Sequence, residues 1–193
     1  MNSVAVYCGS SDRIKEVYLE AAHLMGGVIA CRGMQLVYGA GSTGMMGAVA
    51  EGTLAAGGEV IGIMPQIFDT PQLAKTDTTR YEVLPDMHSR KKRIAEIADG
   101  FIALPGGFGT LEEFFEIVTW AQIGLHRKPV GLLNTSGYYD ALLGFLAQVE
   151  REGFMYEEHS RLFQVEGEPE PLLELMEAYQ PPPGLERWVE RDG

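Results

Sequence analysis

The sequence is poor in cysteine, has no excess of positive charge and contains no long apolar run, and each absence excludes a class of protein. Two cysteines, Cys8 and Cys31, cannot form a disulfide framework, and no His/Cys/Asp cluster has metal-ligand spacing. We therefore expect a reducing cytoplasm, no metal and no cofactor. The formal net charge of −12 opposes binding to nucleic acid or to a membrane surface. No apolar stretch approaches the roughly 18 residues that span a bilayer.

What the chain does contain is a regular alternation of short β-branched runs with longer helical patterns, which is typical of a parallel sheet covered by helices. The expected strands are residues 3–8, 35–38, 59–64, 81–84, 100–105, 129–134 and 161–165. The expected helices lie near residues 13–31, 43–57, 87–98, 109–125, 137–152 and 169–179. The pattern predicts an α/β fold of Rossmann type, with an open and mainly parallel sheet flanked by helices.

Two segments lack a clear period. Residues 65–80 contain two prolines, and we expect a long loop near the mouth of the site. Residues 181–193 begin with three prolines and then turn charged, which predicts a peripheral tail that Trp188 attaches to the body or to a partner chain. We expect residues 1–180 to form a single domain.

A first glycine run, YGAGSTGMMG at residues 38–47, matches the spacing of a dinucleotide-binding turn at Gly39, Gly41 and Gly44. A NAD site also needs an acidic residue at the end of the next strand, and that strand ends in Ile-Met-Pro at residues 63–65. No Lys-Ser/Thr pair follows Gly44, so a Walker-type nucleotide loop is excluded. Three interpretations remain: a tight structural turn, a turn that faces a ligand and, disfavoured by the missing acid, a NAD site.

A second glycine run, PGGFGT at residues 105–110, follows a buried strand and leads at once into a helix. Consecutive glycines let backbone N–H groups turn toward a ligand, and Thr110 adds a hydroxyl at a helix N-terminus that carries partial positive charge. This pattern favours a phosphate site, although a tight connection between strand and helix has the same composition.

A carboxylate and a guanidinium lie on helix faces that are otherwise apolar. Glu113 shares its side of the expected helix with Ile117 and Trp120. Arg90 falls within the apolar stripe of the preceding helix, whereas Lys92 falls on its solvated face. Because charged groups in such positions need a partner or a function, Arg90 and Glu113 are candidate site residues.

With these motifs, the sequence resembles the LONELY GUY family of cytokinin riboside 5′-monophosphate phosphoribohydrolases, older members of which were labelled possible lysine decarboxylases. The resemblance covers about residues 3–165 and rests on VYCGSS, VYGAGSTGMMG, MHSRK, PGGFGTLEE, VTWAQIG and KPVGLLN. It implies a Rossmann-like homodimer with active sites near the interface. The implied reaction is hydrolysis of the N-glycosidic bond of a purine (cytokinin) riboside 5′-monophosphate, AMP or an N6-modified AMP, to free base and ribose 5-phosphate.

The resemblance also implies roles for individual residues. Arg90 and Glu113 look like the catalytic pair. Further substrate contacts are expected at Lys91, Gly106, Gly107, Phe108, Gly109, Thr110, Glu112 and Thr119, and also at Gly41 and Gln72. Two positions depart from the pattern: Gly39-Ala40-Gly41 replaces a triple glycine, and Gln72 stands where many members have a glutamate.

Two other functions are compatible with the fold class. A non-catalytic carrier of a nucleotide or of molybdenum cofactor would lack the Arg–Glu pair, and this chain has both residues. A decarboxylase that uses pyridoxal phosphate would need a lysine placed to form a Schiff base, and no motif identifies one.

Overall fold

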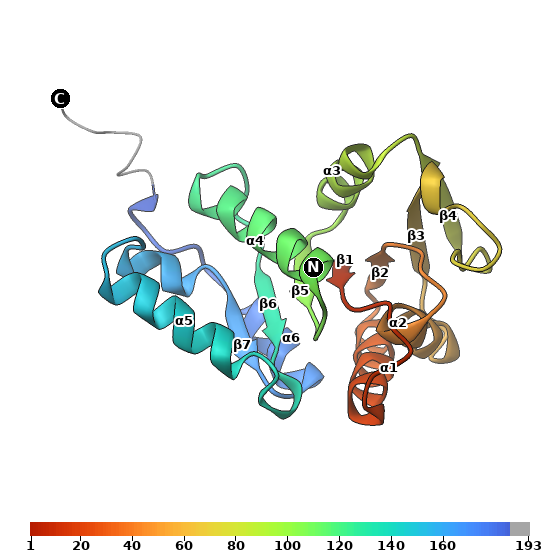
Figure 1. The fold of residues 1–193 in the computed structure, drawn as a ribbon, viewed down its shortest axis with the longest axis horizontal. Coiled ribbons are helices and arrows are strands. Elements are labelled where there is room, and N and C mark those ends of the chain that lie inside the picture. The colour runs from red at the N-terminus through yellow and green to blue at the C-terminus, as the bar shows by residue number, and fades with distance from the viewer. Residues whose placement is uncertain (186–193) are drawn as a thin grey trace.

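Seven parallel strands form one open sheet in the order β4-β3-β2-β1-β5-β6-β7 (Figure 1). The computed structural model describes residues 1–185. The strands are β1 Ser3–Tyr7, β2 Gln35–Tyr38, β3 Val60–Pro65, β4 Arg80–Leu84, β5 Gly100–Ala103, β6 Val130–Leu133 and β7 Gln164–Glu166. The helices are α1 Glu16–Cys31, α2 Gly44–Ala55, α3 Met87–Ile97, α4 Phe108–Gln122, α5 Asp140–Arg151 and α6 Pro169–Glu177, with short 3-10 turns η1 Gln66–Phe68, η2 Thr135–Gly137 and η3 Glu157–Arg161. The expected α/β fold is confirmed.

Helices cover both faces of the sheet, which explains why the central strands are apolar throughout. All five residues of β1 are buried. Its alternate side chains enter two cores: Val4 and Val6 pack with α1, α2 and α6, whereas Ala5 and Tyr7 pack with α3, α4 and α5 (Figure 1). None of the helices within residues 1–185 is long and apolar enough to cross a membrane.

The strand order changes direction at β1. The chain proceeds outward from β1 through β2 and β3 to β4, and then returns through α3 to β5 on the other side of β1. Open α/β sheets bind ligands at such a switch point, outside the carboxyl ends of the strands. Here the loops that follow β1 and β5 are hydrogen-bonded to each other, because the N–H of Gly9 donates to the carbonyl of Pro105 over 3.1 Å.

Several element boundaries differ from the sequence-based expectation by one to three residues, and two of the differences have a clear physical reason. The last strand, expected at residues 161–165, begins at Gln164, because the preceding residues form η3 and then place Leu162 and Phe163 in contact with the helices. Apolar residues that alternate in a loop and in an edge strand look alike in sequence. The helix expected from residue 137 begins at Asp140, because Ser136 and Gly137 have φ of 54° and 70°.

The loop at residues 65–80 crosses the carboxyl edge of the sheet beside the first glycine run. Gly41 and Ala74 form a β-bridge, and the N–H of Lys75 donates to the carbonyl of Ala40 over 2.9 Å. These bonds fix the loop at the mouth of the site, as expected. Trp188 and the rest of residues 186–193 lie outside the described residues, so the expectation for the tail stays a prediction.

Candidate active site

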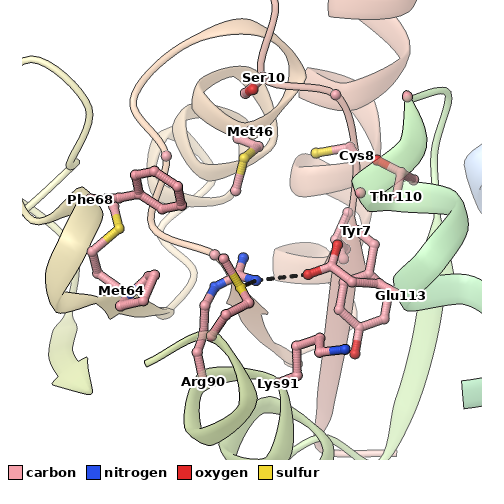
Figure 2. A pocket seen from close by; sticks show the side chains of 18 of the residues that line it. Tyr7, Cys8, Ser10, Met46, Met64, Phe68, Arg90, Lys91, Thr110 and Glu113 are labelled. Carbon is pink, nitrogen blue, oxygen red and sulfur yellow. Dashed lines mark hydrogen bonds and ion pairs between the residues drawn. The ribbon is translucent and has the colours of Figure 1, made fainter. Parts of the chain in front are cut away.

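A cavity of about 630 Å³ opens at the carboxyl edge of the sheet. Its wall contains residues from the end of β1, the first glycine run, the end of β3 with the following loop, α3 and the start of α4. The cavity therefore lies at the switch point between β1 and β5. Figure 2 shows the Arg90 side chain between Met64 and Phe68 on one side and Glu113, Tyr7 and Thr110 on the other, with Met46 above it.

Arg90 and Glu113 form an ion pair at the base of the cavity. Nη1 of Arg90 donates to Oε1 of Glu113 over 2.7 Å, and the two side chains are only 9% and 13% exposed. Nε of Arg90 donates over 3.2 Å to the carbonyl of Ile63, which lies near the end of β3. A Cβ at Gly39 would lie 1.8 Å from Nη2 of Arg90, so the absence of a side chain there makes room for the guanidinium.

The surroundings of Glu113 favour its protonated form more than water does. Burial raises the pKa of Glu113, and the charge and hydrogen bond of Arg90 offset this only in part. Burial also raises the pKa of Tyr7 and of Cys8 in the same wall, so both stay neutral near pH 7. Of Glu113, Tyr7 and Cys8, it is therefore Glu113 that is suited to exchange a proton with a substrate or a water.

Lys91 makes a second connection between the same two helices. Its Nζ donates to Oε1 of Glu112 over 2.6 Å and to Oε1 of Glu116 over 2.9 Å. Burial lowers the pKa of Lys91, but the two hydrogen bonds and the carboxylate charges outweigh that effect and raise it overall. Neighbouring cations on α3 therefore pair with neighbouring acids on α4.

The second glycine run presents an uncapped helix N-terminus to the cavity. No side chain caps α4 at Gly107, and the N–H groups of Gly107, Phe108 and Gly109 find no acceptor within residues 1–185. A Cβ at Gly106 would lie 2.1 Å from Oγ1 of Thr110, so the close packing of this hydroxyl requires a glycine. Free N–H groups at a helix N-terminus are the arrangement that binds phosphate.

The first glycine run is built differently. Asp12 Oδ1 accepts from the N–H of Gly44 over 2.8 Å, and the carbonyl of Gly9 accepts from the N–H of Met45 over 3.0 Å. The N-terminus of α2 is thereby filled by this chain's own loop, so Gly44 serves a structural turn with φ of 57°. Gly39 and Gly41 do face the cavity. The interpretation as a structural turn therefore fits Gly44, and the interpretation as a ligand-facing turn stays a prediction for Gly39 and Gly41.

The structure places the predicted site residues in two groups. Gly106 in the turn and Phe108 at the start of α4 do not line the cavity, and Phe108 is 94% exposed. Thr119 is exposed on α4, about 120° around the helix from Glu113, and Gln72 is an exposed residue whose carbonyl accepts from Ser42 Oγ over 3.3 Å. The cavity wall contains the others: Arg90, Glu113, Lys91, Gly107, Gly109, Thr110, Glu112 and Gly41.

Several wall residues were not predicted from the sequence. Ser10 follows β1 and lies in the cavity wall near Met46 (Figure 2), where its carbonyl accepts from Thr43 Oγ1 of the first glycine run over 2.7 Å. Its position directly after a buried strand was the available signal. An apolar part of the wall consists of Met46, Met64, Phe68 and Leu73. Met46 belongs to the first glycine run, but no motif linked it to the other three residues, because loop and helix side chains converge there only in three dimensions.

A family model described as possible lysine decarboxylase matches residues 46–176. The chain belongs to this family. A protein of Oryza sativa subsp. japonica named as a probable cytokinin riboside 5′-monophosphate phosphoribohydrolase is 43% identical, over 91% of this chain and 83% of the relative. A protein of Arabidopsis thaliana named as a cytokinin riboside 5′-monophosphate phosphoribohydrolase is 42% identical, over 92% of this chain and 82% of the relative. The resemblance to the LONELY GUY family is confirmed.

Solved structures share the family's fold at lower identity. The molybdenum cofactor binding protein from Rippkaea orientalis is 23% identical, with a TM-score of 0.70 over 91% of this chain and 95% of that chain. The Moco carrier protein from Chlamydomonas reinhardtii is 22% identical, with a TM-score of 0.68 over 91% of this chain and 95% of that chain. At these identities the likeness extends to the fold and not to the function.

Proposed function

We propose that the protein hydrolyses the N-glycosidic bond of a purine riboside 5′-monophosphate, with a cytokinin nucleotide as the substrate class, and releases the free base and ribose 5-phosphate. The observation that carries this proposal is the buried Arg90–Glu113 pair in the same cavity as an uncapped helix N-terminus. Relatives at 42% and 43% identity that are named for this reaction support it.

The second glycine run binds the 5′-phosphate in this proposal. The N–H groups of Gly107 and Gly109 and the hydroxyl of Thr110 are the donors, and the partial positive charge of α4 adds to them. Glu113 lies six residues beyond Gly107, about 9 Å along the axis of α4. One nucleotide is therefore long enough to reach both the phosphate donors and Glu113. Lys91 and Glu112 line the same wall and are proposed as further nucleotide contacts.

Glu113 and Arg90 carry out the chemistry. As the bond between C1′ and the base nitrogen breaks, positive charge develops on the ribose ring, and the carboxylate of Glu113 stabilises that charge. The carboxylate also takes a proton from the attacking water, whose oxygen bonds to C1′. The electron pair of the broken bond leaves with the base, which gains a proton from solvent, and Glu113 then releases the proton of the water to solvent. Arg90 orients Glu113 through Nη1, and its Nη2, which has no acceptor within residues 1–185, is available to the nucleotide.

The apolar part of the wall supports a base that carries an apolar N6 group. Met46, Met64, Phe68 and Leu73 line the cavity, and Figure 2 shows Met64 and Phe68 on the side away from Glu113. Methionine side chains adapt to irregular apolar groups, and the aromatic ring adds a flat contact surface. Gln72 precedes Leu73 in this loop, so we propose that the loop determines the preference between AMP and its N6-substituted forms.

Pyridoxal-phosphate chemistry fits this cavity poorly, although the family description mentions lysine decarboxylase. Lys91 is the lysine that the described residues place in the wall, and its ammonium group is held by Glu112 and Glu116. These contacts raise its pKa, whereas a lysine that forms a Schiff base needs a lowered one. We therefore derive no step through this cofactor.

We further propose that the enzyme is a cytoplasmic homodimer that associates near the site. Phe108, Phe115 and Thr119 lie on one face of α4, because residues spaced by seven and four positions share a side of a helix. Phe108 is 94% exposed and Phe115 is 36% exposed, which is an unfavourable arrangement for a face in contact with water. Phe108 and Thr119 would then meet the substrate at the interface. Light scattering of the wild type and of Phe115→Asp tests this, and a monomeric wild type would contradict it.

The reaction is tested by incubating the protein with AMP and with N6-isopentenyl-AMP and measuring the released base by chromatography. We expect release from the N6-substituted nucleotide to be the faster, and Glu113→Gln to lower kcat by at least about 100-fold with KM little changed. Glu96→Gln, an exposed acid on α3, is the matched control and should behave as wild type. Binding of AMP without release of base by the wild type would overturn the hydrolase and favour a carrier.

A further inference from the structure

Two adjacent tyrosines beyond β6 donate hydrogen bonds to the carbonyl groups around the second glycine run. Tyr138 Oη donates to the carbonyl of Gly106 over 2.8 Å, and Tyr139 Oη donates to the carbonyl of Leu104 over 2.6 Å. The donors and acceptors are more than 30 residues apart in the chain. Neither tyrosine lines the cavity, so each bond holds the turn from behind.

The bond from Tyr138 determines the direction of a peptide group that faces the cavity. In a trans peptide the C=O and the N–H point in opposite directions. The carbonyl of Gly106 points to Tyr138, outside the cavity, and the N–H on the same peptide belongs to Gly107, which lines it. The hydrogen bond on the outer side therefore turns the N–H of Gly107 inward.

Without that bond, this peptide is free to rotate. Glycines flank it on both sides, and glycine adopts backbone conformations that other residues avoid at little cost. The reversed orientation would direct a carbonyl oxygen, instead of an N–H donor, at a bound anion. We propose that Tyr138 is a positioning residue, which keeps the second glycine run in its anion-binding form; this inference rests on the proposed function, in which the run holds the 5′-phosphate.

The position of Tyr138 is itself fixed by its neighbours. Its ring meets the rings of Tyr18 and Tyr139 edge-on, with centroids 5.6 Å and 4.8 Å away. The backbone of the next residue is held by Asn134, whose Oδ1 accepts from the N–H of Tyr139 over 2.7 Å. Tyr138 is 42% exposed, so Tyr138→Phe keeps the ring contacts and removes just the hydroxyl.

The test compares Tyr138→Phe with the wild type in two measurements. KM for the nucleoside 5′-monophosphate should rise roughly tenfold, because one donor to a charged phosphate is no longer oriented, whereas kcat should stay near wild type. The inhibition constant of ribose 5-phosphate should rise by about the same factor. A variant that only loosened the fold would lower kcat or the melting temperature without this selective loss of phosphate affinity.

Two matched variants decide between orientation and general loosening. Tyr139→Phe removes the equivalent hydroxyl bond from the buried Leu104 carbonyl, and it should lower the melting temperature while leaving the ribose 5-phosphate constant near wild type. Tyr18→Phe keeps the ring next to Tyr138 and should leave both unchanged. An unchanged constant in Tyr138→Phe, or an equal rise in the Tyr139 or Tyr18 variant, overturns the proposal.

The two proposals fail in different ways. If the wild type releases no base from nucleotides, the hydrolase proposal fails, and calorimetry with ribose 5-phosphate still measures whether Tyr138→Phe weakens binding. If the wild type does not bind ribose 5-phosphate at all, the second glycine run is not a phosphate site and the role of Tyr138 is overturned.

Discussion

Arg90 on α3 donates through Nη1 to Glu113 on α4 over 2.7 Å, while its Nε is held by the carbonyl of Ile63 in β3. The guanidinium of Arg90 is therefore fixed by β3, whereas the carboxylate of Glu113 is positioned by α4, the helix that follows β5. Both charges are buried, and removal of either partner would leave the other without compensation. This mutual dependence gives the pair a single geometry in which to meet a substrate.

The pH dependence of the reaction should reflect the raised pKa of Glu113. The proposed mechanism needs its carboxylate, so kcat/KM should fall as the pH drops through that pKa, at a higher pH than an ordinary glutamate near 4.3 would produce. Arg90→Gln removes the charge that lowers this pKa, so the acid limb of its residual activity should move to still higher pH. A pH–rate profile of both proteins measures the shift, and an acid limb at an ordinary carboxyl pKa in the wild type would contradict the assignment.

Gly39→Ala should impair the reaction more than it impairs the fold. The added Cβ would lie 1.8 Å from Nη2 of Arg90, and the end of this side chain can move aside. The displaced guanidinium no longer aligns Glu113, so we expect kcat to fall about 100-fold with a small change in melting temperature. Gly27→Ala is the control, because a Cβ at Gly27 in α1 would meet no atom within 4 Å. This substitution should stabilise the protein by about 0.5–1 kcal/mol and leave the activity normal. Equal kinetics for the two variants would refute the role of Gly39.

Lys91→Met should weaken the contact between α3 and α4, the two helices that carry the Arg90–Glu113 ion pair. Glu112 and Glu116 lose their shared partner, which we expect to cost about 1–2 kcal/mol in the free energy of unfolding and about tenfold in kcat/KM. The neighbouring Lys92 is 76% exposed, so Lys92→Met should remain close to wild type. Urea unfolding and steady-state kinetics of both variants test this, and indistinguishable results would mean that the contacts of Lys91 with Glu112 and Glu116 contribute nothing to stability or activity.

Asp12→Ala should weaken the fold and spare phosphate binding. Asp12 Oδ1 accepts from the N–H of Gly44 at the start of α2, and the loss of such a cap costs about 1 kcal/mol. Asp12→Asn retains an acceptor and should recover most of this stability. Urea unfolding measures the loss. A selective rise in the KM of the nucleotide, with stability unchanged, would instead assign the first glycine run to the ligand.

The fold and the central pair were accessible from the sequence because their signals are local. Strands buried on both faces read as continuous apolar runs, and Arg90 and Glu113 were conspicuous as charges on apolar helix faces. The assignment of the hydrolytic reaction depended in addition on the resemblance to a family. The sheet order, in which β1 pairs with β2, was needed to place Ser10 next to the first glycine run.

Other parts of the site could not be predicted, because they depend on contacts between distant segments. The apolar wall combines Met46 of α2 with Phe68 and Leu73 of the loop, and no single-sequence pattern links these positions. Tyr138 reaches Gly106 across 32 residues of sequence. The geometry of Thr119 was equally inaccessible, because a motif match gives the position of a residue and not the direction of its side chain.

The return of the chain from β4 to β5 has a consequence for folding. The segment up to α3 supplies Arg90 and its anchor on β3, and the segment from β5 onward supplies Glu113. Neither fragment contains a complete site, so a chain divided between α3 and β5 regains activity only when its two pieces reassociate into one sheet. Catalytic activity thus serves as a reporter of cooperative assembly across the whole molecule, and not of the stability of any one element.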